Sequence, residues 1–178
     1  MPNARPSLVP PPVWTLLFGA AMWEADRRWP LITVVAPPWN RLGWCVMALA
    51  FIAPFTAIRR FGRAGTTVSP HQPDAASVLV TDGVYAWTRN PMYLGLTVAL
   101  VGWAVRLGSL TAFAGPLLFV PLLARVQILP EERALRARFG REYQDYCARV
   151  NRWLGRRSRG QPPAAPTAGG RSPPPSSP

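Results

Sequence analysis

Four nearly charge-free apolar segments within about 120 residues constrain this chain more than any other feature. They are residues 8–23, 42–58, 90–105 and 107–124. Each is somewhat shorter than the ~20 residues of an upright membrane helix, but flanking residues can extend it. A single segment of this kind also occurs as a buried core helix of a soluble protein. Because four occur together with so few charges between them, we predict an all-α polytopic membrane protein with about four transmembrane helices.

The remaining apolar stretch and the two ends of the chain complete this organisation. Residues 29–40 (WPLITVVAPPWN) are a fifth, shorter apolar stretch, which we interpret as an interfacial or re-entrant segment or part of a span. The N-terminal segment resembles a signal peptide after Arg5, but its three consecutive prolines and lack of a small-x-small cleavage site favour a membrane helix. Residues 155–178 are dominated by Pro, Gly and Ser, and cannot bury enough apolar surface to order themselves. We therefore expect one membrane domain over 1–154 and a disordered tail over 155–178.

The basic residues indicate how the chain is oriented. All 20 are arginines, and the net charge is +12. With the N-terminus inside, four arginines fall in outside segments (Arg27, Arg28, Arg41 and Arg106) and the other sixteen inside, as the positive-inside rule requires. Arginines that orient helices and contact anionic lipid explain the charge without nucleic acid, for which no motif is present. Arginine in place of every lysine is typical of GC-rich bacterial genomes. We expect a bacterial inner-membrane protein with cytosolic termini.

Metal and soluble-nucleotide chemistry have no support in the sequence. Cys45 lies in an apolar segment and Cys147 in a charged one, so on this topology they face opposite sides and cannot pair. With His71 as the single histidine, we expect no metal site. No G-x-G-x-x-G follows a strand, and there is no P-loop. Any cofactor must therefore be bound by the membrane helices and their inner loops.

Residues 83–95 (GVYAWTRNPMYLG) place polar groups where the third apolar segment begins. Asn90 suits the N-cap, and Pro91 suits the first helical position. The positive end of that helix attracts anions, and Arg89 beside it can bind a carboxylate through two hydrogen bonds. Aromatic and glycine residues flank it: Gly83, Tyr85, Tyr93 and Gly95. The alternative is an interfacial anchor, with Arg89 against lipid phosphate.

Residues 129–153 (LPEERALRARFGREYQDYCARVNRW) predict a C-terminal amphipathic cytosolic helix. Pro130 suits its first turn, where Glu131 and Glu132 complement the helix dipole. Apolar and aromatic residues recur at helical spacing: Leu135, Phe139, Tyr143, Tyr146 and Val150. Such a helix can simply lie on the membrane. However, two acids directly after a span, in a chain with only eight, point to a functional carboxylate, either Glu131 or Glu132.

The two segments together offer the groups that bind S-adenosylmethionine. Arg89 and the helix start suit its α-carboxylate, the glutamates suit its ammonium, and tyrosine faces attract its sulfonium by cation–π interaction. The candidate tyrosines are Tyr85, Tyr93 and Tyr143.

These segments resemble the isoprenylcysteine carboxyl methyltransferase family and its bacterial relatives. That family shows G-x-Y…R-(H/N)-P-x-Y-x-G, a helical hairpin, and then E-E…F-G-x-x-Y-x-x-Y. The matching residues are Gly83, Tyr85, Arg89, Asn90, Pro91, Tyr93, Gly95, Glu131, Glu132, Phe139, Gly140, Tyr143 and Tyr146. The resemblance covers roughly residues 65–153. Founding eukaryotic members have histidine at the position of Asn90, which puts any imidazole contact in doubt here.

The resemblance implies a membrane methyltransferase that uses S-adenosylmethionine, with a pocket open to the cytosol and a side opening for a lipophilic acceptor. It implies that Arg89 and Glu132 are catalytic. The cofactor-binding residues it implies are Tyr85, Asn90, Pro91, Tyr93, Leu94, Gly95, Glu131 and Tyr143. The acceptor stays open between a prenylated cysteine carboxylate, a lipid amine and a small isoprenoid acid, and no obligate protein partner is expected.

Two other classes remain as alternatives. Membrane sterol reductases carry a related R-x-P-x-Y-x-G segment and bind NADPH, although they are much longer. A non-catalytic membrane scaffold is the other.

Overall fold

The computed structural model describes residues 9–64 and 78–156. Its helical elements are α1 (Pro11–Arg28), η1 (Trp39–Arg41), α2 (Leu42–Leu49), α3 (Ile52–Ala64), η3 (Gly83–Ala86), α4 (Pro91–Leu107), α5 (Leu110–Leu123), η4 (Ala124–Ile128) and α6 (Leu129–Arg149). Outside them, the only β-type pairs in these ranges are two isolated bridges, Thr33–Ser109 and Val150–Arg156. The all-α prediction is confirmed. Most of the predicted tail, residues 157–178, lies outside the described residues.

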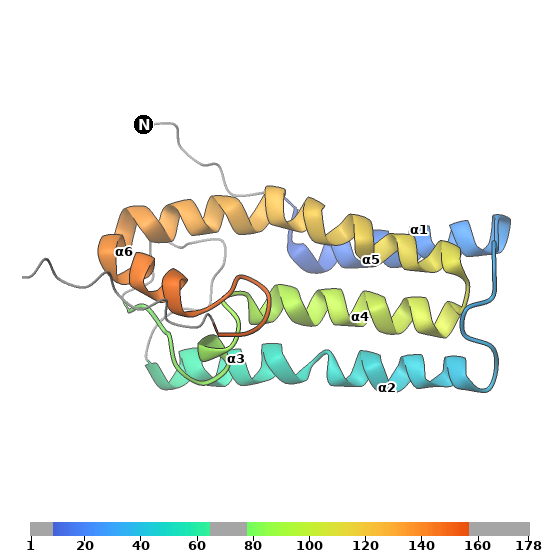
Figure 1. Cartoon of the computed structure of the whole chain (residues 1–178), viewed down its shortest axis with the longest axis horizontal. Coiled ribbons are helices and arrows are strands. Elements are labelled where there is room, and N and C mark those ends of the chain that lie inside the picture. The colour runs from blue at the N-terminus through green and yellow to red at the C-terminus, as the bar shows by residue number, and fades with distance from the viewer. Residues whose placement is uncertain (1–8, 65–77, 157–178) are drawn as a thin grey trace, which may run out of the picture.

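Helix α4 is the centre of the bundle, because it packs against α1, α2, α3 and α5 (Figure 1). It begins with Pro91 at its first turn and ends at Gly108, which adopts the left-handed conformation with φ 88°. Its closest neighbour is α2. A Cβ at Gly43 would lie 2.4 Å from the carbonyl oxygen of Gly102, so the two backbones are in direct contact there. Small residues permit such close helix packing.

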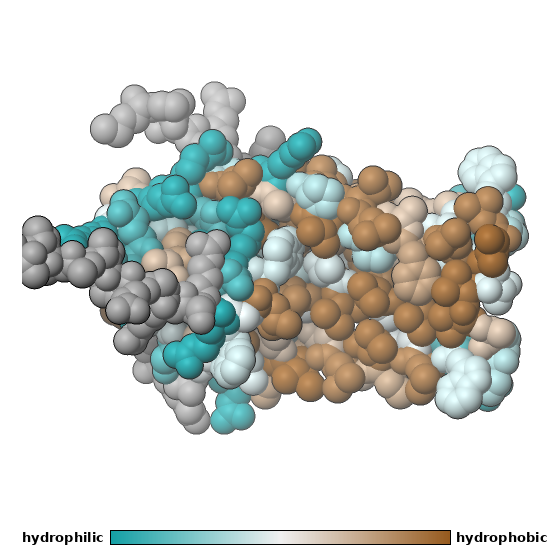
Figure 2. Space-filling model, in the orientation of Figure 1, coloured by the Kyte–Doolittle hydropathy of each residue, from teal (hydrophilic) through white to brown (hydrophobic). Residues whose placement is uncertain are grey.

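Two helical runs are long and apolar enough to cross a membrane, Trp39–Arg59 and Leu110–Arg149, and α4 is a shorter apolar helix. All four predicted apolar segments are helical, but a count of four spans is not established. Only 17% of the apolar window in Trp39–Arg59 is buried. An exposed apolar surface of this extent is unusual for a soluble monomer. Figure 2 shows this surface over the helices at the right, and hydrophilic residues around α6 at the left.

The run Leu110–Arg149 changes character along its length. Helix α5 carries no charged residue, whereas α6 carries acidic and basic residues from Glu131 onward. The charged helix therefore extends beyond the apolar part, at the hydrophilic end of the molecule (Figure 2).

Of residues 29–40, Trp39 and Asn40 begin η1, and the others form an irregular connection at the opposite end of the bundle from α6 (Figure 1). The amide of Val34 donates to Gly108 O at 2.8 Å, and the amide of Leu31 donates to the Thr111 hydroxyl at 3.2 Å. The segment is thus tied to the α4–α5 turn. Its entry into the membrane stays a prediction.

Helix α6 is not continuous as predicted, because Gly140 has φ 51° and ψ −118° within it. Residues other than glycine adopt these angles only at an energetic cost, because their Cβ is strained there. The chain reverses there, and the second half of α6 folds back beneath the first (Figure 1, left). The predicted stripe is therefore divided: Tyr143, Tyr146 and Val150 form a buried core with Tyr85 and Ala57, whereas Leu135 and Phe139, before the reversal, are only partly buried against it. The stripe therefore packs against the protein's own 83–95 segment.

Candidate active site

Arg89 lies between η3 and α4, with its side chain only 8% exposed. Its Nη1 is 3.1 Å from Glu132 Oε1. The same nitrogen donates to Cys147 Sγ at 2.7 Å and to the Tyr143 hydroxyl at 3.4 Å. Its Nε is buried and has no hydrogen-bond partner among the described residues. A buried donor without a partner is costly, so this nitrogen is a candidate contact for a ligand.

Glu132 is held by a second arginine. Arg152 donates from Nε to Oε1 at 2.9 Å and from Nη2 to Oε2 at 2.7 Å, a two-point pairing. Burial alone would raise the pKa of Glu132, but the Arg152 hydrogen bonds and the charges of Arg89 and Arg152 outweigh it and lower the pKa. Glu132 is therefore ionised at neutral pH. Two arginines around one carboxylate leave a net positive charge in the cluster.

Glu131 faces a different partner, because the Tyr93 hydroxyl of α4 donates to its Oε1. Burial raises the pKa of Glu131 to about 7, with the Tyr93 hydrogen bond acting against this and the charge of Glu132 adding to it. Within the described part of the chain, no arginine forms an ion pair with Glu131. Its carboxylate can therefore pair with a cationic ligand.

The two acids of α6 follow a short turn of different helical geometry. Element η4 is a π-helical turn, and its buried Gln127 donates to Val9 O at 3.0 Å. Such turns are frequent at functional sites. Successive helical residues point about 100° apart, so Glu131 and Glu132 cannot share one partner. The acid pair consequently contributes to two neighbouring sites.

Asn90 occupies the predicted N-cap position of α4, but its side chain makes no capping hydrogen bond. The prediction that the side chain caps the helix is wrong. Its Nδ2 donates instead to Arg152 O at 3.0 Å, and the Thr88 hydroxyl donates to the same oxygen at 3.4 Å. The Asn90 side chain turns toward this carbonyl rather than toward the first turn of α4, because the end of α6 lies beside it. Any polar side chain with an N–H donor could make that contact, histidine included.

The segment after α6 closes over the same turn, which sequence reasoning did not foresee. The amide of Arg89 donates to Asn151 O at 3.2 Å, and the amide of Gly155 donates to Trp87 O at 2.8 Å. Gly155 and Arg156, which we assigned to the tail, are thus placed in the structure. No local pattern distinguishes Arg152 from the many other arginines of this region, so nothing in the sequence singled it out.

The candidate tyrosines contact different groups of the site. Tyr143 and Tyr146 are 2% and 3% exposed, and the Tyr146 hydroxyl donates to Tyr85 O at 2.8 Å. Tyr143 lies against Arg89, whereas Tyr93 lies against Glu131. Burial first, and the charge of Glu131 second, raise the pKa of Tyr85, which places that phenol within electrostatic reach of the carboxyl.

Leu94 and Gly95 line a separate apolar pocket of about 270 Å³ rather than the charged cluster. The other lining residues include Leu49, Ala50, Thr56, Val84 and Val98. Gly95 is needed for packing, since a Cβ there would lie 2.5 Å from Pro54 Cγ. Pro91 is buried in the first turn of α4. An apolar pocket therefore adjoins the segment that carries Arg89.

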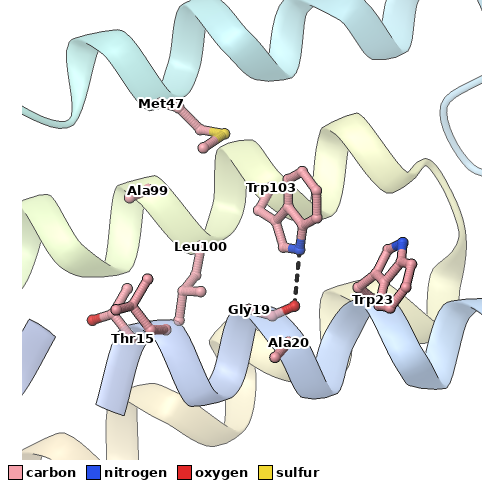
Figure 3. A pocket seen from close by; sticks show the side chains of 9 residues that line it. Thr15, Gly19, Ala20, Trp23, Met47, Ala99, Leu100 and Trp103 are labelled. Carbon is pink, nitrogen blue, oxygen red and sulfur yellow. Dashed lines mark hydrogen bonds between the residues drawn. The ribbon is translucent and has the colours of Figure 1, made fainter. Parts of the chain in front are cut away.

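A larger apolar pocket of about 440 Å³ lies between α1, α2 and α4 (Figure 3). Its lining includes Thr15, Gly19, Trp23, Met47, Leu100 and Trp103. Trp103 Nε1 donates to Gly19 O at 3.0 Å across it. None of the predicted site residues lines this pocket.

Comparison with known proteins matches the part of the chain that contains Arg89 and Glu132 to a protein family. Residues 39–142, more than half of the chain, match the family model described as phospholipid methyltransferase. An uncharacterized protein of Haemophilus influenzae is 40% identical over 63 residues, which are 35% of this chain and the whole of that protein. No solved structure gives a significant match.

Several relatives have a named activity, and two of them illustrate the match. The protein-S-isoprenylcysteine O-methyltransferase of Tribolium castaneum is 31% identical over 111 residues, and the B enzyme of that name from Arabidopsis thaliana is 33% identical over 112. Each alignment covers 62% of this chain, but the chain spans only 40% and 56% of these two proteins. The chain therefore belongs to the phospholipid methyltransferase family, and the resemblance of its motifs to isoprenylcysteine carboxyl methyltransferases is confirmed by these relatives.

Proposed function

We propose that this protein is an integral membrane methyltransferase that uses S-adenosylmethionine to methylate a lipophilic acceptor, with a carboxylate as the methylated group. The observation that carries the proposal is the buried Arg89, whose Nε has no partner among residues 9–64 and 78–156, within the segment that matches the family model. Two helical runs that are apolar enough to cross a membrane support the lipophilic acceptor.

The donor set fits the cofactor. Arg89 and the first turn of α4 would hold its α-carboxylate, because guanidinium and helix N-terminus both favour an anion. Glu131, which has a tyrosine rather than an arginine as partner, would hold its ammonium. Glu132 then keeps Arg89 in place. When bound, the cofactor supplies a methyl group activated by a sulfonium.

Methylation of a carboxylate needs no general base, because the acceptor oxygen is already ionised. The chain's task is to align the two reactants and to exclude water. The apolar pocket beside Val84 and Leu94 would hold the lipophilic part of the acceptor. On the predicted topology, the charged end faces the cytosol of a bacterial cell.

Calorimetry of the detergent-purified full chain with S-adenosylmethionine tests the cofactor. We expect micromolar binding that is lost in Arg89→Ala and weakened in Glu131→Gln. Arg149→Ala, an exposed arginine on α6, is the matched control and should bind as wild type. A folded wild type that binds no S-adenosylmethionine contradicts the proposal, and binding of NADPH in its place would support a reductase.

The acceptor class is tested by transfer of a labelled methyl group to three probes: a farnesylated cysteine derivative, an isoprenoid acid and a lipid amine. A methyl ester releases its label as methanol in mild alkali, whereas a methylamine keeps it. Alkali-labile product supports carboxyl methylation. Stable label on the amine alone would contradict it and leave the cofactor assignment intact.

A further inference from the structure

We propose that Arg152 is a positioning residue of this site, and that the segment 150–155 completes the site by joining the start of α6 to the turn that carries Arg89. The inference rests on the proposed function for its link to cofactor binding. Arg152 lies beyond residues 39–142, the part of the chain that matches the family model.

The side chain of Arg152 fixes the carboxylate of Glu132. It contacts both oxygens, at 2.9 and 2.7 Å, in the planar two-point arrangement that arginine forms with carboxylates. Glu132 has a side chain only 7% exposed, whereas that of Arg152 is 35% exposed. Arg152 therefore fixes a buried acid from its solvent side.

The backbone of the same residue holds the other half of the site. Arg152 O accepts hydrogen bonds from Asn90 Nδ2 at 3.0 Å and from Thr88 Oγ1 at 3.4 Å. Arg89 lies between those two residues, and its own amide donates to Asn151 O. One residue thus bridges Glu132 and the turn of Arg89.

This arrangement controls which donors of Arg89 remain free. Because Arg152 contacts both oxygens of Glu132, the acid contacts Arg89 through Nη1, and Arg89 Nε stays without a partner in the part of the chain that the structure describes. Without Arg152, the carboxylate of Glu132 could turn to pair with Arg89 at two points, since that is the favoured geometry. Arg89 Nε would then be occupied by the protein's own acid. Arg152 therefore keeps Arg89 available for the carboxylate of a ligand.

The first test measures S-adenosylmethionine affinity in the full chain for Arg152→Gln, Arg152→Lys and the exposed control Arg149→Gln. Loss of a hydrogen bond between charged groups weakens binding by about 10–100-fold, so we expect Arg152→Gln to bind S-adenosylmethionine about 10–100-fold more weakly. Arg152→Lys should recover part of the loss, because lysine keeps the charge but not the two-point geometry. Arg149→Gln should equal wild type. Wild-type affinity in Arg152→Gln overturns the proposal.

A double-mutant cycle separates positioning from a general structural role. If Arg152 acts through Glu132, Glu132→Gln combined with Arg152→Gln should bind no more weakly than Glu132→Gln alone. Additive losses, as for independent sites, would overturn the proposal.

Hydrogen exchange tests the bridge without any ligand. The amides of residues 87–90 should exchange faster in Arg152→Gln than in wild type and Arg149→Gln, because their contact with the 150–155 segment is loosened. Unchanged exchange overturns the proposal. If wild type binds no S-adenosylmethionine, the proposed function fails, but this measurement still decides the bridge.

Discussion

Arg89 Nη1 lies 3.1 Å from Glu132 Oε1, although the two side chains come from separate elements and are only 8% and 7% exposed. A buried ion pair gains little net stability, because desolvation of both charges offsets their attraction. Arg152 and Tyr143 supply further hydrogen bonds to the pair. A small net gain in stability from the pair is consistent with the proposed role of the cluster in binding an anionic ligand.

Glu132→Gln should destabilise the protein and abolish turnover. It removes the negative charge that pairs with both Arg89 and Arg152, and breaking a buried pair in this way costs about 3 kcal/mol. Thermal unfolding in detergent measures the loss, and membrane insertion should be unaffected. The exposed Glu142→Gln on the same helix is the control. Full activity in Glu132→Gln would remove Glu132 from the site.

Glu131 should make stability depend on pH in the direction opposite to most carboxyls. Its pKa is about 7 in the fold against an ordinary value of 4.5, so between these values the folded state binds more protons than the unfolded state. Stability contributed by this group therefore falls as pH rises, by about 3 kcal/mol across the interval. The measurement is the difference in unfolding free energy between wild type and Glu131→Gln from pH 4.5 to 7.5. A difference that stays flat or grows in favour of wild type would contradict the assignment.

Gly140→Ala should destabilise the reversal in α6 by about 1–3 kcal/mol, because its backbone angles are strained for any residue with a Cβ. A Cβ there would meet no neighbouring atom within 4 Å among the described residues, so the cost comes from the local backbone conformation and not from packing against another segment. Cofactor binding should fall with it, since the reversal places Tyr143 beside Arg89. Melting temperature and S-adenosylmethionine affinity report the two effects. Ala137→Gly, at an exposed helical position, should cost about 1 kcal/mol and leave the affinity unchanged.

Gly95→Ala should be destabilising by about 1–3 kcal/mol because the added methyl overpacks the contact with α3. The new Cβ would lie 2.5 Å from Pro54 Cγ and 2.6 Å from Ala50 O. Gly19→Ala in α1 is the matched control, since its Cβ would meet only ordinary contacts at 4.0 Å. Alanine is the better helix former, so that control should be neutral or slightly stabilising. Equal melting temperatures for the two variants would show that α3 and α4 can move apart freely.

The sequence by itself determined the helical architecture and the place of the site. If uncharged runs of this length enter a membrane, they must satisfy their own backbone polar groups, and a helix does so within one segment. Pro91 and Pro130 marked the first turns of α4 and α6, and the Arg89 and acid-pair motifs indicated the residues that the structure brings together.

Only the tertiary structure decided how these residues pair. Glu131 and Glu132 are adjacent in sequence, yet one faces Tyr93 and the other faces Arg89, because the helix turns about 100° between them. The side chain of Asn90 does not cap α4 but donates to Arg152 O, which lies close because the chain reverses at Gly140. Local periodicity predicts which residues share a face, but the partner of a polar side chain depends on where distant segments meet.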